Sequence, residues 1–243
     1  MVSAMKGTFY GLGVGPGDPD LLTVKAYRIL QEADVIITPT KKMGKPSIAY
    51  KIVESHIAPQ TQVVEMSFPM ISLSKERETL EKQWKQNADE IEVLLNQGKS
   101  VVFLTLGDPM VFSTYSYVME FLLDRGIEVI TLSGIPSFCN LAAQINVPLT
   151  QGEESLGIVA MTQPLEEIRQ ILDAHKNIVI MKVSANNAVL AEELEARGLE
   201  HSFVLVSNIG MESQSIVRDI EVLKGKIPYL STLLIKKDYD IKL

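Results

Sequence analysis

The chain has 243 residues, of which 46% are hydrophobic and 22% are charged, and its 23 lysine and arginine residues against 30 aspartate and glutamate residues give a net charge of −7. This composition excludes a largely disordered chain, and it argues against duplex nucleic acid as the main partner because phosphate neutralisation needs clustered cations. Cys139 is the single cysteine, so an internal disulfide is excluded, and no Cys/His spacing resembles a closed zinc site.

The cellular setting can also be predicted from the sequence. No apolar run approaches the roughly 20 residues of a membrane-spanning helix, and residues 1–6 lack the apolar region of a secretory signal. A single cysteine is compatible with a reducing compartment. We therefore expect a cytoplasmic protein that binds a small molecule and has no membrane partner, no nucleic-acid partner and no bound metal.

Short apolar runs alternate with amphipathic stretches along the chain, as in a parallel sheet covered by helices. In chain order, the sequence predicts strands at residues 8–14, 35–38, 100–106, 129–132, 157–161, 177–183, 202–206 and 229–236. It predicts early helices at residues 21–33, 48–57 and 75–96, with helical patterns between most of the later strands. In the last of these helices, Trp84 lies on the apolar face and is expected in the core.

The first predicted strand runs into a glycine-rich loop, residues 11–18 (GLGVGPGD). The spacing does not match the dinucleotide motif G-x-G-x-x-G, because the sixth position is Pro16 counted from Gly11 and Asp18 counted from Gly13. Pro16 has no N–H to donate, and Asp18 would repel a phosphate. The loop therefore favours a neutral or cationic ligand, with a plain tight turn between strand and helix as the alternative.

Two further junctions have the same character. Leu106-Gly107-Asp108-Pro109 follows the buried strand at residues 100–106, and residues 132–137 (LSGIPS) follow the next strand. If the sheet is parallel, all three loops lie at the carboxyl edge, where ligands bind in open α/β sheets. Asp108 could hold a hydroxyl group or a cation there, or it could simply form an Asp-Pro turn.

No catalytic histidine is expected at these junctions. The three histidines, His56, His175 and His201, lie in stretches that read as polar helix or loop surface.

Four motifs occur in order along the chain: GVGPGDPDLLT at residues 13–23, LGDP at 106–109, SGIPS at 133–137 and IMKV at 180–183. Together they resemble the tetrapyrrole methylase family, the S-adenosylmethionine-dependent methyltransferases of corrin and sirohaem biosynthesis. The segment Gly210-Met-Glu, residues 227–232 (IPYLST) and Lys236-Lys237 resemble one branch, the C20-methyltransferases of precorrin-2 or cobalt-factor II. The resemblance extends over about residues 7–237.

The resemblance implies two α/β domains, residues 1–115 with a mainly parallel sheet and residues 116–243 with a mixed sheet. It also implies an active site in the cleft between them and a homodimer. The implied reaction is methyl transfer from S-adenosylmethionine to C20 of a tetrapyrrole in cobalamin biosynthesis. The alternatives are methylation at another ring position and a nucleotide-binding protein that transfers no methyl group.

The resemblance also assigns site residues. The implied cofactor contacts are Pro16, Leu106, Gly107, Asp108, Val111, Pro136, Ser137, Lys182, Ile209 and Leu233. Asp108 and Lys182 are also the candidate catalytic residues. Family members often carry threonine where this chain has Pro136, and Ser137 could supply the hydroxyl group instead.

The carboxylates of a tetrapyrrole conflict with the net charge of −7, so local cations must override the overall field. The candidates are Arg28, Lys41, Lys42, Lys45 and Lys182. Lys182 stands in the apolar run at residues 178–183, and a lysine there is expected to reach a cleft. We expect it to place the macrocycle or to accept a proton from it.

Overall fold

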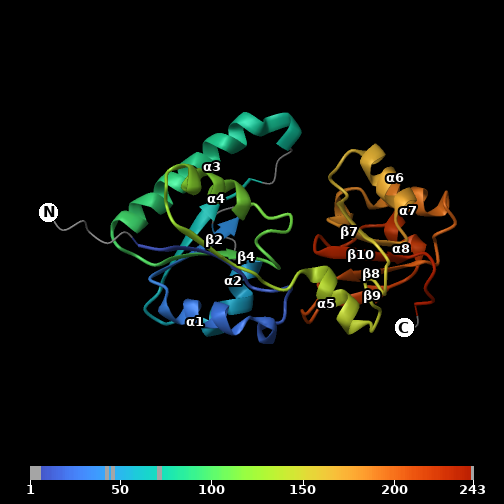
Figure 1. Ribbon diagram of the computed structural model, residues 1–243, viewed down its shortest axis with the longest axis horizontal. Helices are drawn as coiled ribbons and strands as arrows, with labels where there is room; N and C mark the ends of the chain where they lie inside the picture. Colours follow the sequence, from blue (N-terminus) through green and yellow to red (C-terminus); the bar gives the residue numbers. More distant parts are fainter. Residues whose placement is uncertain (1–6, 42–43, 45–46, 70–72, 242–243) are drawn as a thin grey trace. The chain divides into compact units, whose positions relative to one another are not determined.

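The computed structural model describes residues 7–41, 44, 47–69 and 73–241 and has two compact units, Met1–Pro136 and Ser137–Leu243 (Figure 1). Each unit is built around a five-stranded sheet. The boundary predicted at residues 115/116 was wrong, because helix α4 (Tyr115–Asp124) and strand β5 (Val129–Leu132) belong to the first unit. There β5 pairs with β1, and Tyr117 of α4 stacks on Trp84 of α3.

The sheet of the first unit has the strand order β3-β2-β4-β1-β5, and every neighbouring pair is parallel. Its other strands are β1 (Phe9–Gly13), β2 (Val35–Thr40), β3 (Gln62–Ser67) and β4 (Val101–Thr105). The helices are η1 (Pro19–Leu21), α1 (Val24–Glu32), α2 (Ile48–Val53), η2 (Glu54–His56), α3 (Leu73–Asn96) and α4. Parallel pairing places the carboxyl ends of all five strands at one edge.

Helices cover both faces of this sheet, with α1 and α2 on one side and α3 and α4 on the other (Figure 1). The central strand β4 is buried on both faces, as its apolar run predicts: Val101 and Phe103 pack toward α3 and α4, and Val102 and Leu104 pack on the opposite side. Trp84 is only 6% exposed, which confirms its predicted place in the core.

The sheet of the second unit has the order β6-β7-β10-β8-β9, in which β6 and β7 are parallel and the other pairs are antiparallel. Its strands are β6 (Leu156–Ala160), β7 (Asn177–Met181), β8 (Phe203–Ser207), β9 (Ser215–Val217) and β10 (Ser231–Lys236). The helices are α5 (Ser137–Gln144), α6 (Leu165–Ala174), η3 (Val183–Ala185), α7 (Asn187–Glu195) and α8 (Ile220–Lys224). The expected α/β fold with one parallel and one mixed sheet is confirmed. Within the described ranges, no helix combines the length and apolar character needed to cross a membrane.

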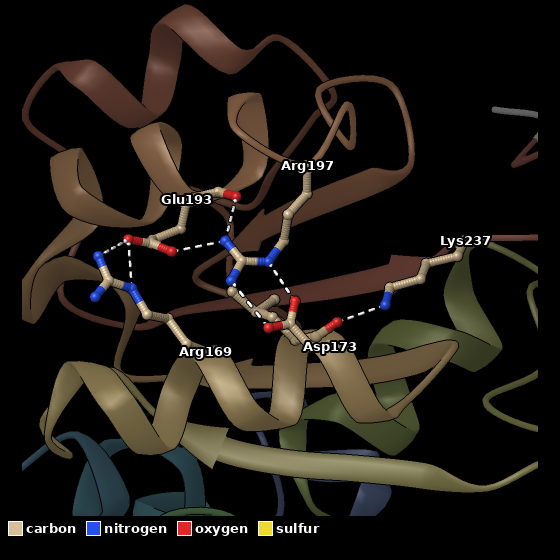
Figure 2. A network of polar contacts seen from close by, with 6 residues as sticks. Arg169, Asp173, Glu193, Arg197 and Lys237 are labelled. Atoms are coloured by element: carbon tan, nitrogen blue, oxygen red, sulfur yellow. Dashed lines mark hydrogen bonds and ion pairs between the residues drawn. The ribbon is translucent and has the colours of Figure 1, made fainter.

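A network of ion pairs joins α6 to α7 in the second unit (Figure 2). Glu193 of α7 is 8% exposed, and its Oε1 accepts hydrogen bonds from Arg169 Nε at 3.0 Å and Nη2 at 2.7 Å. Its Oε2 accepts a bond of 2.6 Å from Arg197 Nη1, and Arg197 Nε donates to Asp173 Oδ1 of α6 at 2.7 Å. The hydrogen bonds from Arg169 and Arg197 hold the pKa of Glu193 below its usual range.

We expect Glu193→Gln to lower the free energy of unfolding by about 1–3 kcal/mol at neutral pH, because it leaves two arginines beside a neutral side chain. Since the pKa is lowered on folding, this stabilisation is present above the unfolded-state pKa and is lost as pH falls through the folded-state pKa. Urea titrations from neutral to acidic pH measure both effects. The exposed neighbour Glu192→Gln is the control, and equal midpoints for the two variants would contradict the prediction.

Candidate active site

The three loops at the carboxyl edge of the first sheet meet backbone to backbone at what we call the glycine junction, Gly13, Gly107 and Gly134. A Cβ atom on Gly134 would lie 2.1 Å from Gly107 O, and one on Gly13 would lie 2.5 Å from Gly134 N. These distances are far below van der Waals contact, so residues 13 and 134 must be glycine for the loops to approach this closely.

Backbone hydrogen bonds extend the junction from β1 to β4. Gly107 N donates to Gly15 O at 2.7 Å, Gly15 N donates to Gly107 O at 3.3 Å, and Val14 N donates to Thr105 O at 2.9 Å. Gly15 has φ +78° and Gly107 has φ +71°, conformations that glycine adopts without strain. The first two loops are therefore fixed to each other by their main chains.

Asp108 connects the second loop to the third. Its Oδ1 accepts a hydrogen bond from Met110 N at 2.8 Å, and its Oδ2 accepts one from Gly134 N at 3.1 Å. The first bond closes a turn, as one of the two interpretations of the sequence predicts, and the second reaches the loop after β5. Because each carboxylate oxygen has two lone pairs, Asp108 retains capacity to accept a bond from a ligand.

Gly11, the first glycine of the loop, leaves room for a buried side chain. A Cβ atom there would lie 2.0 Å from Cζ of the buried Tyr115, whose hydroxyl group makes a 2.7 Å hydrogen bond with Thr131 Oγ1. Burial raises the pKa of this tyrosine. The first glycine of the loop thus admits an aromatic ring from α4 and is not part of the glycine junction.

The hydrogen-bonding character of this edge limits what it can bind. Several backbone N–H groups are used within the protein, namely those of Val14, Gly15, Gly107, Met110 and Gly134. Phosphate sites need several N–H groups directed at the ligand, whereas this edge presents the carboxylates of Asp18 and Asp108 and a proline at position 16. The arrangement favours a cation or a hydroxyl donor over a pyrophosphate.

The structure places the predicted cofactor residues of the first unit in these three loops. Pro16 and Gly107 are buried, and the half-buried ones are Leu106, Asp108, Val111 and Pro136. Of the candidate cations, Lys41 is exposed directly after β2 and Arg28 is exposed on α1, while Lys42 and Lys45 lie outside the described residues.

The second unit also gathers predicted residues at one sheet edge. Strands β7 and β8 both pair antiparallel with β10, so their carboxyl ends share an edge with the start of β10. Lys182 directly follows β7 and Ile209 lies two residues beyond β8. Leu233 lies further along β10, and its side chain is fully buried in the core of the unit.

At this edge, Ser137, Met181 and Thr232 form a hydroxyl–thioether cluster. Ser137 Oγ lies 3.1 Å from Thr232 Oγ1 and 3.7 Å from Met181 Sδ, and Thr232 Oγ1 lies 3.9 Å from the same sulfur atom. Of the three, sequence reasoning singled out Ser137 alone. Met181 and Thr232 lie inside the motifs IMKV and IPYLST, but neither was predicted as a site residue.

Lys182 has an unusual backbone and environment. Its φ is +52°, in the left-handed region that residues other than glycine and asparagine seldom adopt. The side chain is half-buried, and burial lowers the pKa of its ammonium group. A lysine with a lowered pKa is a suitable proton acceptor at lower pH than a free lysine.

Residues 8–221 match the family model for tetrapyrrole (corrin/porphyrin) methylases. The chain belongs to this family. It is 33% identical over 239 residues to the cobalt-precorrin-2 C(20)-methyltransferase of Salmonella typhimurium, covering 97% of this chain and 99% of the relative. It is 36% identical to a probable cobalt-precorrin-2 C(20)-methyltransferase of Methanocaldococcus jannaschii, covering 94% and 95%.

Solved structures of other tetrapyrrole methylases share the fold. A cobalt precorrin-4 methyltransferase superposes with a TM-score of 0.73 at 22% identity, covering 94% of each chain. Uroporphyrin-III C-methyl transferase from Thermus thermophilus, solved with S-adenosyl homocysteine, superposes with a TM-score of 0.68 at 23% identity, covering 95% of this chain and 98% of that one. The family resemblance seen in the four motifs is confirmed.

We expect Asp108→Asn to destabilise the first unit by about 1.5–3 kcal/mol, because asparagine keeps one acceptor oxygen and loses the charge that both N–H groups now meet. Urea unfolding measures this loss, and amide hydrogen exchange should accelerate at Met110 and Gly134 in particular. The control is Asp124→Asn, exposed at the end of α4. If stability and exchange at both amides were unchanged, the connecting role of Asp108 would be wrong.

Proposed function

We propose that the protein transfers a methyl group from S-adenosylmethionine to C20 of precorrin-2 or cobalt-factor II, a step of cobalamin biosynthesis. The proposed methylation site, C20, rests on sequence similarity. The chain is 33% and 36% identical to two proteins named as cobalt-precorrin-2 C(20)-methyltransferases, over nearly the whole of each chain. The character of the carboxyl edge in the first unit supports the cofactor.

The residues at that edge fit S-adenosylmethionine, which carries a sulfonium cation, an adenosine and an amino acid but no phosphate. Several backbone N–H groups of the three loops are used within the protein, and the carboxylates of Asp18 and Asp108 can accept further bonds from cationic and hydroxyl groups. The proposed cofactor contacts are Pro16, Leu106, Gly107, Asp108, Val111, Pro136, Ser137, Lys182, Ile209 and Leu233.

S-adenosylmethionine supplies an activated methyl group, and the electron-rich macrocycle supplies the nucleophile. The task left to the protein is to hold the sulfur, the methyl carbon and C20 in line, and such orientation can lower a barrier by up to about 7–11 kcal/mol. The bond from carbon to sulfur breaks as the bond to C20 forms. One proton must then leave C20, and we propose that Lys182 Nζ, in its neutral form, accepts it.

The test uses the full chain with precorrin-2 or cobalt-factor II and methyl-labelled S-adenosylmethionine. We expect the label on C20 of the product by nuclear magnetic resonance. Calorimetry should show binding of S-adenosylhomocysteine and none of NAD or ATP. A label on another ring carbon would correct the ring position alone, whereas binding of NAD or ATP without S-adenosylhomocysteine would overturn the proposed function.

We also infer a homodimer from the family resemblance. Light scattering should then give a mass twice the 26.9 kDa of one chain, and a mass of one chain at micromolar concentration would contradict it. The cytoplasmic location stays a prediction.

We expect Lys182→Met to lower the methylation rate about 100-fold, the lower range for loss of a general base. A lysine accepts a proton only when neutral, so the wild-type rate should rise with pH through a pKa below the usual lysine value. The variant should lack this rise. Lys226→Met, at an exposed position, is the control, and a wild-type rate for Lys182→Met across the pH range would exclude the proton-accepting role.

A further inference from the structure

We propose that Met110 and Phe112 form an apolar platform that binds the flat face of the tetrapyrrole, an inference that rests on the proposed function. Both residues lie in the loop between β4 and α4, which starts at the carboxyl edge of the first sheet. Met110 is 60% exposed and Phe112 is 41% exposed. Single exposed apolar residues are ordinary on protein surfaces, but here two lie within three residues beside the glycine junction.

Hydrogen bonds fix the loop on both sides of Phe112. Before it, Asp108 Oδ1 accepts from Met110 N at 2.8 Å and Asp108 O accepts from Val111 N at 3.2 Å. After it, Ser113 Oγ accepts from Tyr115 N at 3.1 Å at the start of α4. The platform is therefore held by the same carboxylate that joins the loops after β4 and β5.

The backbone of Phe112 is strained. Its φ is +48°, and the other non-glycine residues with positive φ in the described part of the chain are Asn146, Lys182 and Asn208. Asparagine tolerates this region, whereas a bulky aromatic residue adopts it only at an energetic cost. Strain of this kind concentrates at ligand-binding and catalytic positions, where the surrounding structure enforces it. Lys182, which also has a positive φ, is itself a proposed site residue.

The chemistry of the two side chains selects the part of the substrate that they contact. An aromatic ring and a thioether pack well against a broad conjugated surface and offer nothing to a carboxylate. Asp108, two residues before Met110, would repel the carboxylates at the rim of the macrocycle. The loop therefore suits the ring face.

The decisive variant is Phe112→Gly, because glycine adopts φ +48° without strain and the fold should be kept or stabilised. We expect the dissociation constant for cobalt-factor II, followed by its absorbance, to rise about tenfold. The dissociation constant for S-adenosylhomocysteine should stay within about twofold of wild type. Phe112→Tyr should keep tetrapyrrole affinity, and Met110→Ser should lose part of it.

Two controls separate the platform from general effects. Asn146→Gly also places a glycine at a residue with positive φ, but in the second unit. Leu123→Ala removes an exposed apolar side chain near the end of α4. Neither should change tetrapyrrole binding. Equal tetrapyrrole affinity for wild type and Phe112→Gly would overturn the platform while leaving the proposed function intact, as would a loss confined to S-adenosylhomocysteine. Wild-type protein that binds neither ligand would refute both.

Discussion

The close backbone contact of Gly13, Gly107 and Gly134 is the constraint on which the candidate site of the first unit depends. Parallel pairing brings the three strand ends to one edge, but only the absence of Cβ atoms lets their loops touch. That contact uses up N–H groups which a phosphate site would need, and it leaves carboxylates in their place. The preference for a cation over a phosphate thus follows from how the loops hold one another.

The second unit builds its edge differently. Its loops are fixed by side chains: the hydroxyl groups of Ser137 and Thr232 meet the sulfur of Met181, and Ser207 Oγ lies 2.7 Å from Ser231 Oγ. Side-chain contacts of this kind tolerate more exchange of residue type than a glycine contact does, because a hydroxyl group can come from serine or threonine.

The sequence predicted the buried parts of the fold better than the exposed parts, for a physical reason. Strand β4 is buried on both faces and reads as a continuous apolar run, so its place was clear. Strand β3 at the sheet edge exposes Gln62 and Val63 and was missed, because its pattern is that of a polar surface. The boundary was placed too early because nothing local in α4 and β5 reveals which sheet they join. Likewise Met181 and Thr232 have ordinary side chains, and only the fold brings them together.

Electrostatics sets the last constraint on how an anionic macrocycle could be held. The net charge of −7 opposes a polycarboxylate at long range, and several of the protein's cations are already engaged in ion pairs with its own carboxylates. Arg125 pairs with Asp89 and Glu92, and Arg169 and Arg197 share Glu193. Guanidinium groups committed to helix–helix contacts add little attraction for a ligand. A tetrapyrrole would then be held largely by burial of the apolar faces of its ring. A binding mode of this kind should depend weakly on ionic strength, because screening acts on exposed charges and leaves apolar contact intact.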